Sequence, residues 1–416
     1  MKAIVPALVL MAGISPALRA PAATPRDAQA TVSPARELQT MRVDYVHRGG
    51  PGGESIRLDR VLADGPWAGS VTQLIDDTNL GEYLFEVVDV ASGRPLFSRG
   101  FSSIYAEWET IPEAKKRNRS FHESVRFPWP GGPVRVTLMK RGADNIFRPL
   151  WSMPVDPRSV SARAAAPRGR VTTLLENGPP QRKVDLLLIS NGYNADELPK
   201  FRLAAGRLTK ALLAMEPFRA RQSDFNVRLL ELAGSPAAVQ FNVFGIERYA
   251  LSYDNQALRN LASATPYDIV GILMNEEKYG GGGIFNQQFT VAAASKEAEY
   301  VFIHELAHHL AGLADEYVGN VTYETGSPQA IEPWEPNLTA LLTPATLKWG
   351  DLIEAGTPIP TPVSYAGKVG AFEGGGYESR GVYRPEVDCL MGSRTSVPFC
   401  RVCQRAISRA IDLYVH

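Results

Sequence analysis

The stretch that most constrains this chain is Val301–Tyr317, which reads VFIHELAHHLAGLADEY. His304 and His308 are four residues apart, so on an α-helix they share one face and can hold a single ion between them. Glu305 lies between them, and a glutamate at that position can take a proton from a water molecule without binding the metal. The spacing therefore predicts a helix that carries a zinc site, with Glu305 as the catalytic residue.

The residues around the two histidines favour that helix. Ser295 can cap its N-terminus, and Gly312 can end it, since glycine readily takes the left-handed conformation of a C-cap. An apolar stripe lies away from the histidines and consists of Phe302, Leu306, Leu310 and Leu313. After Gly312 the chain turns back, which brings Asp315 or Glu316 towards the metal. The alternative is a buried helix whose histidines are satisfied core residues.

The run HELAHHLAGLADEY resembles the signature of the IgA-peptidase family of zinc metallopeptidases, a metzincin-like group. In that family H-E-x-x-H is followed by a glycine and an aspartate, which here are Gly312 and Asp315. The general metzincin pattern would place the glycine at Ala311 and the third ligand at Ala314, so this chain runs one residue later for both. The third ligand is therefore inferred from the resemblance.

The resemblance implies one zinc ion per chain, held by His304, His308 and Asp315. Glu316 stays open as an alternative third ligand, although we favour Asp315. His309 is rotated by roughly 100° from the ligand face, so we interpret it as a structural residue or a partner of the ligands.

The N-terminus has the features of an export signal. Lys2 precedes an apolar run from Ala3 to about Leu18, and small-residue sites such as Ala20-Pro21-Ala22 follow. Prolines and a glycine break the run, and it is too short to span a bilayer. We expect a signal peptide and short leader over residues 1–30 and a protein that is secreted or periplasmic. The alternative is an apolar N-terminus that the mature chain retains.

The amino-acid composition limits the number of domains and the classes of molecule that this protein is expected to bind. The 416 residues include 44% hydrophobic ones, enough for two domains with real cores. Lys and Arg together number 44 and balance 44 Asp and Glu, so nothing favours nucleic acid or an anionic membrane surface. No segment after the leader resembles a membrane span. The expected partner is a protein or peptide substrate, and the oligomeric state stays open.

Residues 41–156 predict an N-terminal all-β sandwich that serves as an accessory domain. Short apolar or alternating runs such as GEYLFEVVDV and GPVRVTLMKR are separated there by turn residues. The segment also resembles the N-terminal accessory domain of the same family, notably at FHESVRFPWP. His47 and His122 are isolated, and we interpret both as surface or satisfied core residues.

Residues 157–181 form a predicted linker, because most of them are small or polar and follow no apolar period. Residues 182–416 then form the catalytic domain. Strands alternate with helices there, at 183–190, 197–215, 225–232, 255–264 and 268–274. This alternation predicts an α/β sheet, and the resemblance implies a metzincin-like peptidase domain with the zinc helix beneath that sheet.

Two features precede the zinc helix. Four glycines at 280–283 predict a flexible flap or a turn with close backbone approach, since the Gly-Lys-Ser/Thr of a phosphate loop does not follow. By resemblance, the strand at 289–294 would present an exposed edge to an extended substrate, which backbone hydrogen bonds would hold. The alternative is an ordinary strand of the sheet.

The long segment 318–379 is rich in Pro and Gly and predicts loops that wall a cleft. The run Asp388-Cys389-Leu390-Met391-Gly392 resembles the Met-turn of metzincins, which implies that Met391 packs below the metal. Tyr383, just before it, is a candidate extra donor to the oxyanion, with plain packing as the alternative.

The chain has three cysteines, Cys389, Cys400 and Cys403. In an exported protein we expect two of them to form a disulfide that ties the Met-turn to the last helix, at 403–415, and one to stay free. Their pairing stays open. A second zinc on three thiolates and a redox C-x-x-C are less favoured alternatives, the latter because no thioredoxin-like frame surrounds it.

These observations predict a secreted zinc endopeptidase in which Glu305 acts as general base and then as general acid. The substrate stays open, since only the family name implies cleavage of immunoglobulin A. The competing hypothesis is a non-catalytic surface protein that binds glycans or proteins on a peptidase scaffold. Such a protein would be expected to have lost Glu305 or a metal ligand.

Overall fold

The structure is a computed structural model that describes residues 38–165, 168–319, 331–343, 345–394 and 397–415. The predicted signal peptide and leader at 1–30 lie outside these residues, and so do 320–330 and 344 of the predicted cleft loops. The described residues belong to one compact unit of the chain. Among their helices, none is long and apolar enough to cross a membrane.

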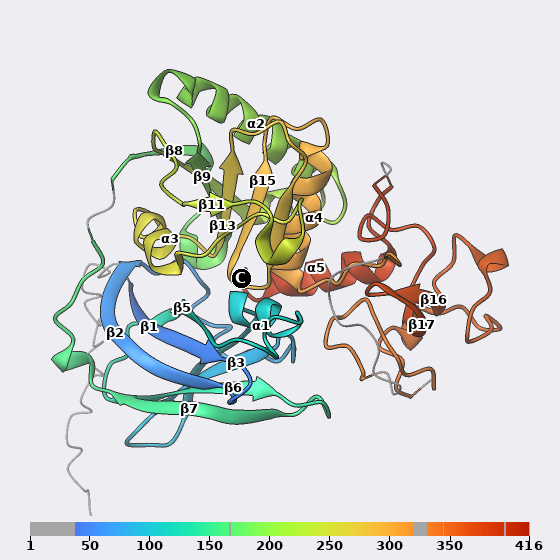
Figure 1. The fold of residues 1–416 in the computed structure, drawn as a ribbon, viewed down its shortest axis with the longest axis horizontal. Coiled ribbons are helices and arrows are strands. Elements are labelled where there is room, and N and C mark those ends of the chain that lie inside the picture. The colour runs from blue at the N-terminus through green and yellow to red at the C-terminus, as the bar shows by residue number, and fades with distance from the viewer. Residues whose placement is uncertain (1–37, 166–167, 320–330, 344, 395–396, 416) are drawn as a thin grey trace, which may run out of the picture. The chain divides into compact units, whose positions relative to one another are not determined.

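Two antiparallel sheets make up the N-terminal region (Figure 1). The first has the order β2 (Ser55–Pro66), β1 (Gln39–Gly49), β5 (Arg119–Pro128). The second has the order β4 (Pro95–Phe101), β3 (Tyr83–Asp89), β6 (Val134–Arg141), β7 (Phe147–Val155). Buried side chains of both sheets, many of them aromatic, form one apolar cluster, as the alternating runs predict.

This region is not entirely β. A short helix, α1 (Ile104–Glu109), follows β4, and the hydroxyl of Ser103 caps it by accepting from the N–H of Ala106. Four of its six residues are buried, so packing against the aromatic cluster stabilises a helix too short to show a sequence period.

A six-stranded mixed sheet organises the C-terminal region, in the order β14-β15-β13-β9-β10-β8. The strands are β8 (Arg170–Leu175), β9 (Val184–Asn191), β10 (Phe225–Glu231), β13 (Ile269–Met274), β14 (Gly281–Ile284) and β15 (Gln288–Ala292). The four central strands run parallel, and the two edge strands, β8 and β14, are antiparallel to their neighbours. β9 is buried at every residue, as expected for a parallel strand with both faces covered.

Helices cover both faces of this sheet (Figure 1). Leu186 and Leu188 of β9 pack in a cluster with α2 (Leu198–Ala214), α4 (Ala298–Ala311) and α5 (Arg401–Asp412). The alternate residues Leu187 and Ile189 pack on the other face with α3 (Asn255–Ala262). The α/β alternation predicted from the sequence is therefore present.

The remaining elements are short. Two-stranded pairs are formed by β11 (Val239–Gln240) with β12 (Leu251–Ser252), and by β16 (Phe372–Gly375) with β17 (Glu378–Arg384). Single 3₁₀ turns lie at Pro157–Ser159, Pro180–Arg182, Ala195–Glu197, Gln222–Asp224, Val243–Gly245, Gly350–Leu352 and Val363–Tyr365.

The predicted linker contains an edge strand. β8 pairs antiparallel with β10, with Val171 opposite Leu230 and Thr172 opposite Leu229. Its side chains are exposed or half-buried, so the strand does not need regularly spaced apolar residues. The sequence therefore shows no apolar pattern there.

The glycine run is not a flap. Gly281 to Gly283 belong to the edge strand β14, and a Cβ atom on Gly283 would lie 2.4 Å from the carbonyl oxygen of Glu305, so glycine allows the strand to lie directly on α4. The expectation that 289–294 forms the exposed edge was wrong, because β14 pairs along β15. The outer side of Gly281 is itself hydrogen-bonded to Arg248 and Ala250.

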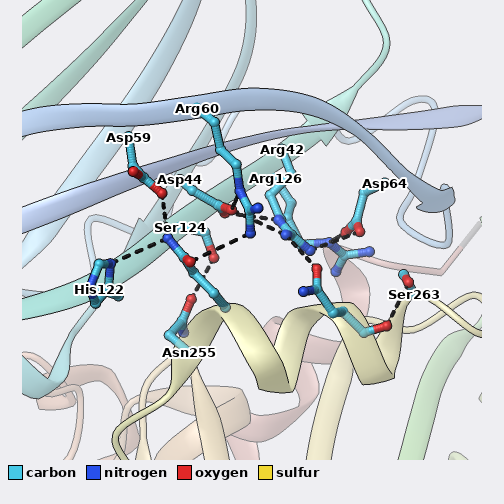
Figure 2. A network of polar contacts seen from close by, with 12 residues as sticks. Arg42, Asp44, Asp59, Arg60, Asp64, His122, Ser124, Arg126, Asn255 and Ser263 are labelled. Atoms are coloured by element: carbon cyan, nitrogen blue, oxygen red, sulfur yellow. Dashed lines mark hydrogen bonds and ion pairs between the residues drawn. The ribbon is translucent and has the colours of Figure 1, made fainter. Parts of the chain in front are cut away.

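A buried polar network joins the first sheet to α3 (Figure 2). Arg42 of β1 is fully buried, pairs with Asp64 at 3.0 Å and donates to Asn260 at 2.7 Å. Ser124 of β5 donates to Asn255 at 2.6 Å. The hydrogen bonds to Asn260 and Asn255 fix the N-terminal sheet against the helix that covers the six-stranded sheet, and the Asp64 carboxylate compensates the buried charge of Arg42.

Candidate active site

The site is built on α4, whose form follows from its sequence. The predicted apolar stripe is buried, and Gly312 ends the helix as a left-handed C-cap with φ 58°. The N-terminus differs from the expectation, because Glu297 is the cap residue and the helix begins at Ala298. Ser295 instead accepts a hydrogen bond from the N–H of Glu297 and donates to its carboxylate.

Three candidate ligand atoms converge at the end of α4. The Nε2 atoms of His304 and His308 are 3.0 Å apart, and Oδ1 of Asp315 lies 3.0 Å from the first and 3.5 Å from the second. Ligands about 2.0–2.1 Å from a tetrahedral zinc ion would lie about 3.3–3.4 Å apart. Oδ1 of Asp315 is buried and has no well-formed hydrogen bond among the described residues, so the three atoms suit a common ion better than pairing with one another.

The other nitrogen of each imidazole faces a carbonyl group. Nδ1 of His308 lies 2.5 Å from the oxygen of Leu313, and Nδ1 of His304 lies 3.4 Å from the oxygen of Leu390. An imidazole that donates from Nδ1 keeps a lone pair on Nε2, so these carbonyl groups favour the tautomer that binds a metal.

Asp315 is held by hydroxyl groups from two directions. Its Oδ2 accepts from the hydroxyl of Tyr317 at 3.0 Å and from that of Tyr377. Arg248 donates to the hydroxyl of Tyr317 at 3.0 Å. Burial alone would raise the pKa of Asp315, but the neighbouring imidazoles, His308 first, hold it well below its usual value. These neighbours favour the ionised carboxylate, which is the form that can bind a metal.

Glu305 lines a cavity of about 500 Å³ together with the three ligand residues. Burial raises the pKa of its carboxyl, and the two imidazoles oppose this effect only in part. A carboxyl group with a raised pKa beside a metal position can accept a proton and return it, as general acid–base catalysis requires.

Two family models match this chain. The model for IgA Peptidase M64 matches residues 172–233, 232–366 and 363–411, and the model for the Peptidase M64 N-terminus matches residues 34–152. The chain belongs to the IgA peptidase M64 family. This confirms the resemblance seen in HELAHHLAGLADEY and makes the chain a member of a peptidase family, which implies protein or peptide substrates. A comparison with curated proteins gave no match.

In this M64 family member, the N-terminal region supplies one wall of the cavity, although its sequence pointed to no functional residue. Burial raises the pKa of Glu107, in α1, to about 7. The lining residues from this region are Glu82, Ser102, Ala106, Glu107, Glu109 and Thr110. Nothing in the local sequence of α1 indicated this, because it depends on how the two regions pack.

Tyr317 and Tyr377 were also missed. Tyr317 lies two residues after Asp315. Tyr377 comes directly after three glycines, and its own φ of 69° is rare for a tyrosine. Tyr383, the predicted donor, is not among the described residues that line the cavity, and its N–H is bonded to Thr339. Met391 is fully buried in the core cluster beside α4.

His309 lies outside the converging ligand atoms. Its Nδ1 is 2.9 Å from the carbonyl oxygen of Ile284, and burial lowers its pKa to about 4, so the ring is neutral. It thus links α4 to β14, which agrees with a structural interpretation.

The predicted disulfide was wrong. All three cysteines are described, buried and free, and the sulfur atoms of Cys389 and Cys403 are 3.7 Å apart, against about 2.05 Å in a disulfide. Glu316 lies with them, its Oε1 3.1 Å from Cys403 and 4.0 Å from Cys400. Three thiols and one carboxylate share a single buried space, so no pair of sulfurs is set apart for a bond.

Proposed function

We propose that this protein is a zinc-dependent endopeptidase. The observation that carries the proposal is the convergence of His304, His308 and Asp315 beside Glu305 at a cavity of about 500 Å³. Two nitrogens and one carboxylate oxygen, with a fourth position left for solvent, are the ligand set of catalytic zinc sites. We further propose that the two N-terminal sheets form the sandwich and that the catalytic domain is metzincin-like.

The proposed mechanism assigns the proton transfers to Glu305. Zinc at the three ligands would supply Lewis acidity, which would lower the pKa of the attacking water towards about 7 and polarise the scissile carbonyl group. Glu305 accepts the proton of the attacking water and passes it to the leaving amine, so it acts first as base and then as acid. Its half-buried position at the cavity, which raises its pKa, favours both steps.

Tyr317 and Tyr377 act on the ligand rather than on the substrate in this proposal. Their hydroxyls donate to Oδ2 of Asp315 and leave Oδ1 directed at the histidines. Such partners of a metal ligand fix its orientation. Substrate binding by edge pairing is not supported at Gly281, because Arg248 and Ala250 already occupy its backbone groups.

The competing function is a non-catalytic protein that binds glycans or proteins. Retention of the general base, all three ligands and an open cavity favours the peptidase. We also propose export to the periplasm or the medium, which the N-terminal sequence supports. Mature protein recovered outside the cytoplasm should then begin after Ala20, and an intact Met1 would contradict export with cleavage.

The test is hydrolysis of an unstructured protein by the purified chain, before and after chelation and zinc restoration. His304→Ala should lose one equivalent of zinc and the hydrolysis with it. His122→Ala is the matched control, because this exposed histidine lies on β5, and it should keep both. Zinc-loaded parent protein without turnover on any unstructured substrate would favour the binding protein.

A further inference from the structure

We propose a second metal site in this chain, a closed structural zinc site formed by Glu316, Cys389, Cys400 and Cys403. It stands apart from the proposed catalytic site and does not depend on peptidase activity. The four ligand atoms lie within 4.8 Å of one another. Three thiolates with one oxygen or nitrogen ligand make a closed four-coordinate set, as in structural zinc sites.

The distances fit a tetrahedral ion. Sulfur ligands about 2.3 Å from zinc would lie about 3.8 Å apart, and a sulfur and an oxygen about 3.5 Å apart. The sulfur atoms of Cys389 and Cys403 are 3.7 Å apart. Oε1 of Glu316 lies 3.1 Å from Cys403 and 4.0 Å from Cys400, on either side of the expected separation.

Because the carboxylate of Glu316 is buried, a cation beside it would compensate its charge. Glu316 is 1% exposed, and none of the cysteines is more than 3% exposed. Oε1 of Glu316 accepts from the side-chain amide of Asn337 at 2.8 Å, while Oε2 has no hydrogen-bond partner among the described residues. A buried carboxylate is costly unless its charge is compensated, and the sulfur atoms of Cys400 and Cys403 lie beside the other oxygen, Oε1.

The backbone is arranged to support thiolates. Cys400 is the N-cap of α5, and its sulfur accepts from the N–H of Cys403 at 3.4 Å. The sulfur of Cys389 accepts from the N–H of Cys400 at 3.3 Å. The positive end of a helix and N–H donors both favour deprotonated sulfur, and C-x-x-C is the usual spacing of a zinc-binding cysteine pair.

The site would fix the segment that carries a catalytic ligand. Glu316 directly follows Asp315, and its N–H donates to the carbonyl oxygen of Met391 at 2.8 Å. A metal that binds Glu316, Cys389 and the start of α5 would tie three distant segments together behind Asp315. Its role is therefore structural, in positioning that residue.

Metal analysis of the His304→Ala variant tests the proposal. The parent protein should hold about two zinc ions per chain and His304→Ala about one, and adding Cys403→Ser should remove the last. Cobalt-loaded His304→Ala should show thiolate-to-metal charge-transfer absorption in the near ultraviolet. The whole chain has three cysteines, so such a band can arise only from this cluster. This measurement leaves the cluster intact and decides the question even if Cys403→Ser does not fold.

Two outcomes would overturn the second site. One is metal-free, folded His304→Ala that takes up cobalt without a thiolate band. The other is a thiol titration, on denatured and chelated protein kept without reductant, that finds one free thiol where the site predicts three. Either result would leave the proposed peptidase function unaffected. Conversely, a fully zinc-loaded parent protein without turnover would contradict the peptidase function and leave the second site unaffected.

Discussion

The two candidate metal clusters begin at neighbouring residues and differ in what surrounds them. Asp315 joins two imidazoles at a cavity of about 500 Å³, whereas Glu316 joins three thiols in a space that is almost completely buried. The first cluster has three protein ligands and access to solvent, and the second has four and none. The number of ligands and the exposure of the fourth position distinguish a catalytic zinc site from a structural one.

Substitution of Asp315 should have the largest effect on turnover, and it should distinguish Asp315 from its neighbour Glu316. Asp315→Ala should lose the zinc at the cavity, and turnover should fall by at least about 10³-fold, because several kcal/mol of metal-ion catalysis disappear. The second equivalent of zinc should remain. Zinc content and hydrolysis of an unstructured protein, measured on one preparation, check this.

Glu316→Gln is the matched control for this substitution. It should weaken the cysteine cluster's hold on zinc while the zinc at the histidines remains. Retention of both equivalents by Asp315→Ala, or loss of the histidine-bound zinc in Glu316→Gln, would contradict the assignment of the neighbours to different clusters.

The parts of the fold and of the candidate site that depend on local sequence could be predicted. HELAHHLAGLADEY encodes α4, its glycine cap and the residues that converge, because all of them are local in sequence. The sequence narrowed the third ligand only to Asp315 or Glu316, since the backbone turn after Gly312 decides which one meets the histidines. The central strands were readable as continuous apolar runs, as for β9.

Other features depend on tertiary packing and left little local signal. β8 is exposed along most of its length, and the wall formed by α1 reaches the cavity only through packing of the two regions. The cysteine spacing suggested a disulfide as readily as a metal site, because spacing does not show that Glu316 completes the cluster.

The pH dependence of folding should arise outside both clusters, at His47. Burial opposes protonation of this histidine, but Glu123 at 2.9 Å and Glu54 at 2.7 Å outweigh it and raise its pKa to about 9. The folded pKa exceeds the unfolded value of about 6.5, so the stabilisation is complete below pH 6.5 and is lost as the pH rises through about 9. The loss is up to about 3 kcal/mol.

Denaturant unfolding at pH 6 and pH 9.5 measures this loss. The parent should lose stability between the two values, and His47→Gln should lose up to about 3 kcal/mol less over the same range. An equal loss in both proteins would place the pH dependence elsewhere, including in the metal clusters.

A smaller effect concerns the hydroxyl groups on Asp315. Tyr377→Phe should weaken zinc affinity at the cavity by roughly 10- to 100-fold, because it removes a hydrogen bond to the ligand carboxylate. Tyr383→Phe removes the same atom from a tyrosine outside the cavity lining and should leave that affinity unchanged. Zinc competition titrations of both variants check this. Equal effects of the two would show that Tyr377 does not act through Asp315.

An effect of similar size on folding concerns the packing of β14 on α4. Gly283→Ala should destabilise folding by about 1–3 kcal/mol, since its Cβ would lie 2.4 Å from the carbonyl oxygen of Glu305. Gly206→Ala in α2 is the control, because its Cβ meets no atom within 4 Å, and it should stabilise by about 0.4–1 kcal/mol. Denaturant unfolding measures both. A neutral Gly283→Ala would mean that β14 moves freely from α4, as a flap would.

The most direct measurement compares zinc content and peptide hydrolysis in one preparation of Glu305→Gln. This residue lies beside the ligand residues and is not one of the converging ligands, so the variant should keep its fold and the full zinc content of the parent protein. Its turnover should fall by at least roughly 10²–10⁴-fold, because glutamine cannot accept the proton. Full zinc with near-normal turnover would contradict the proposed mechanism.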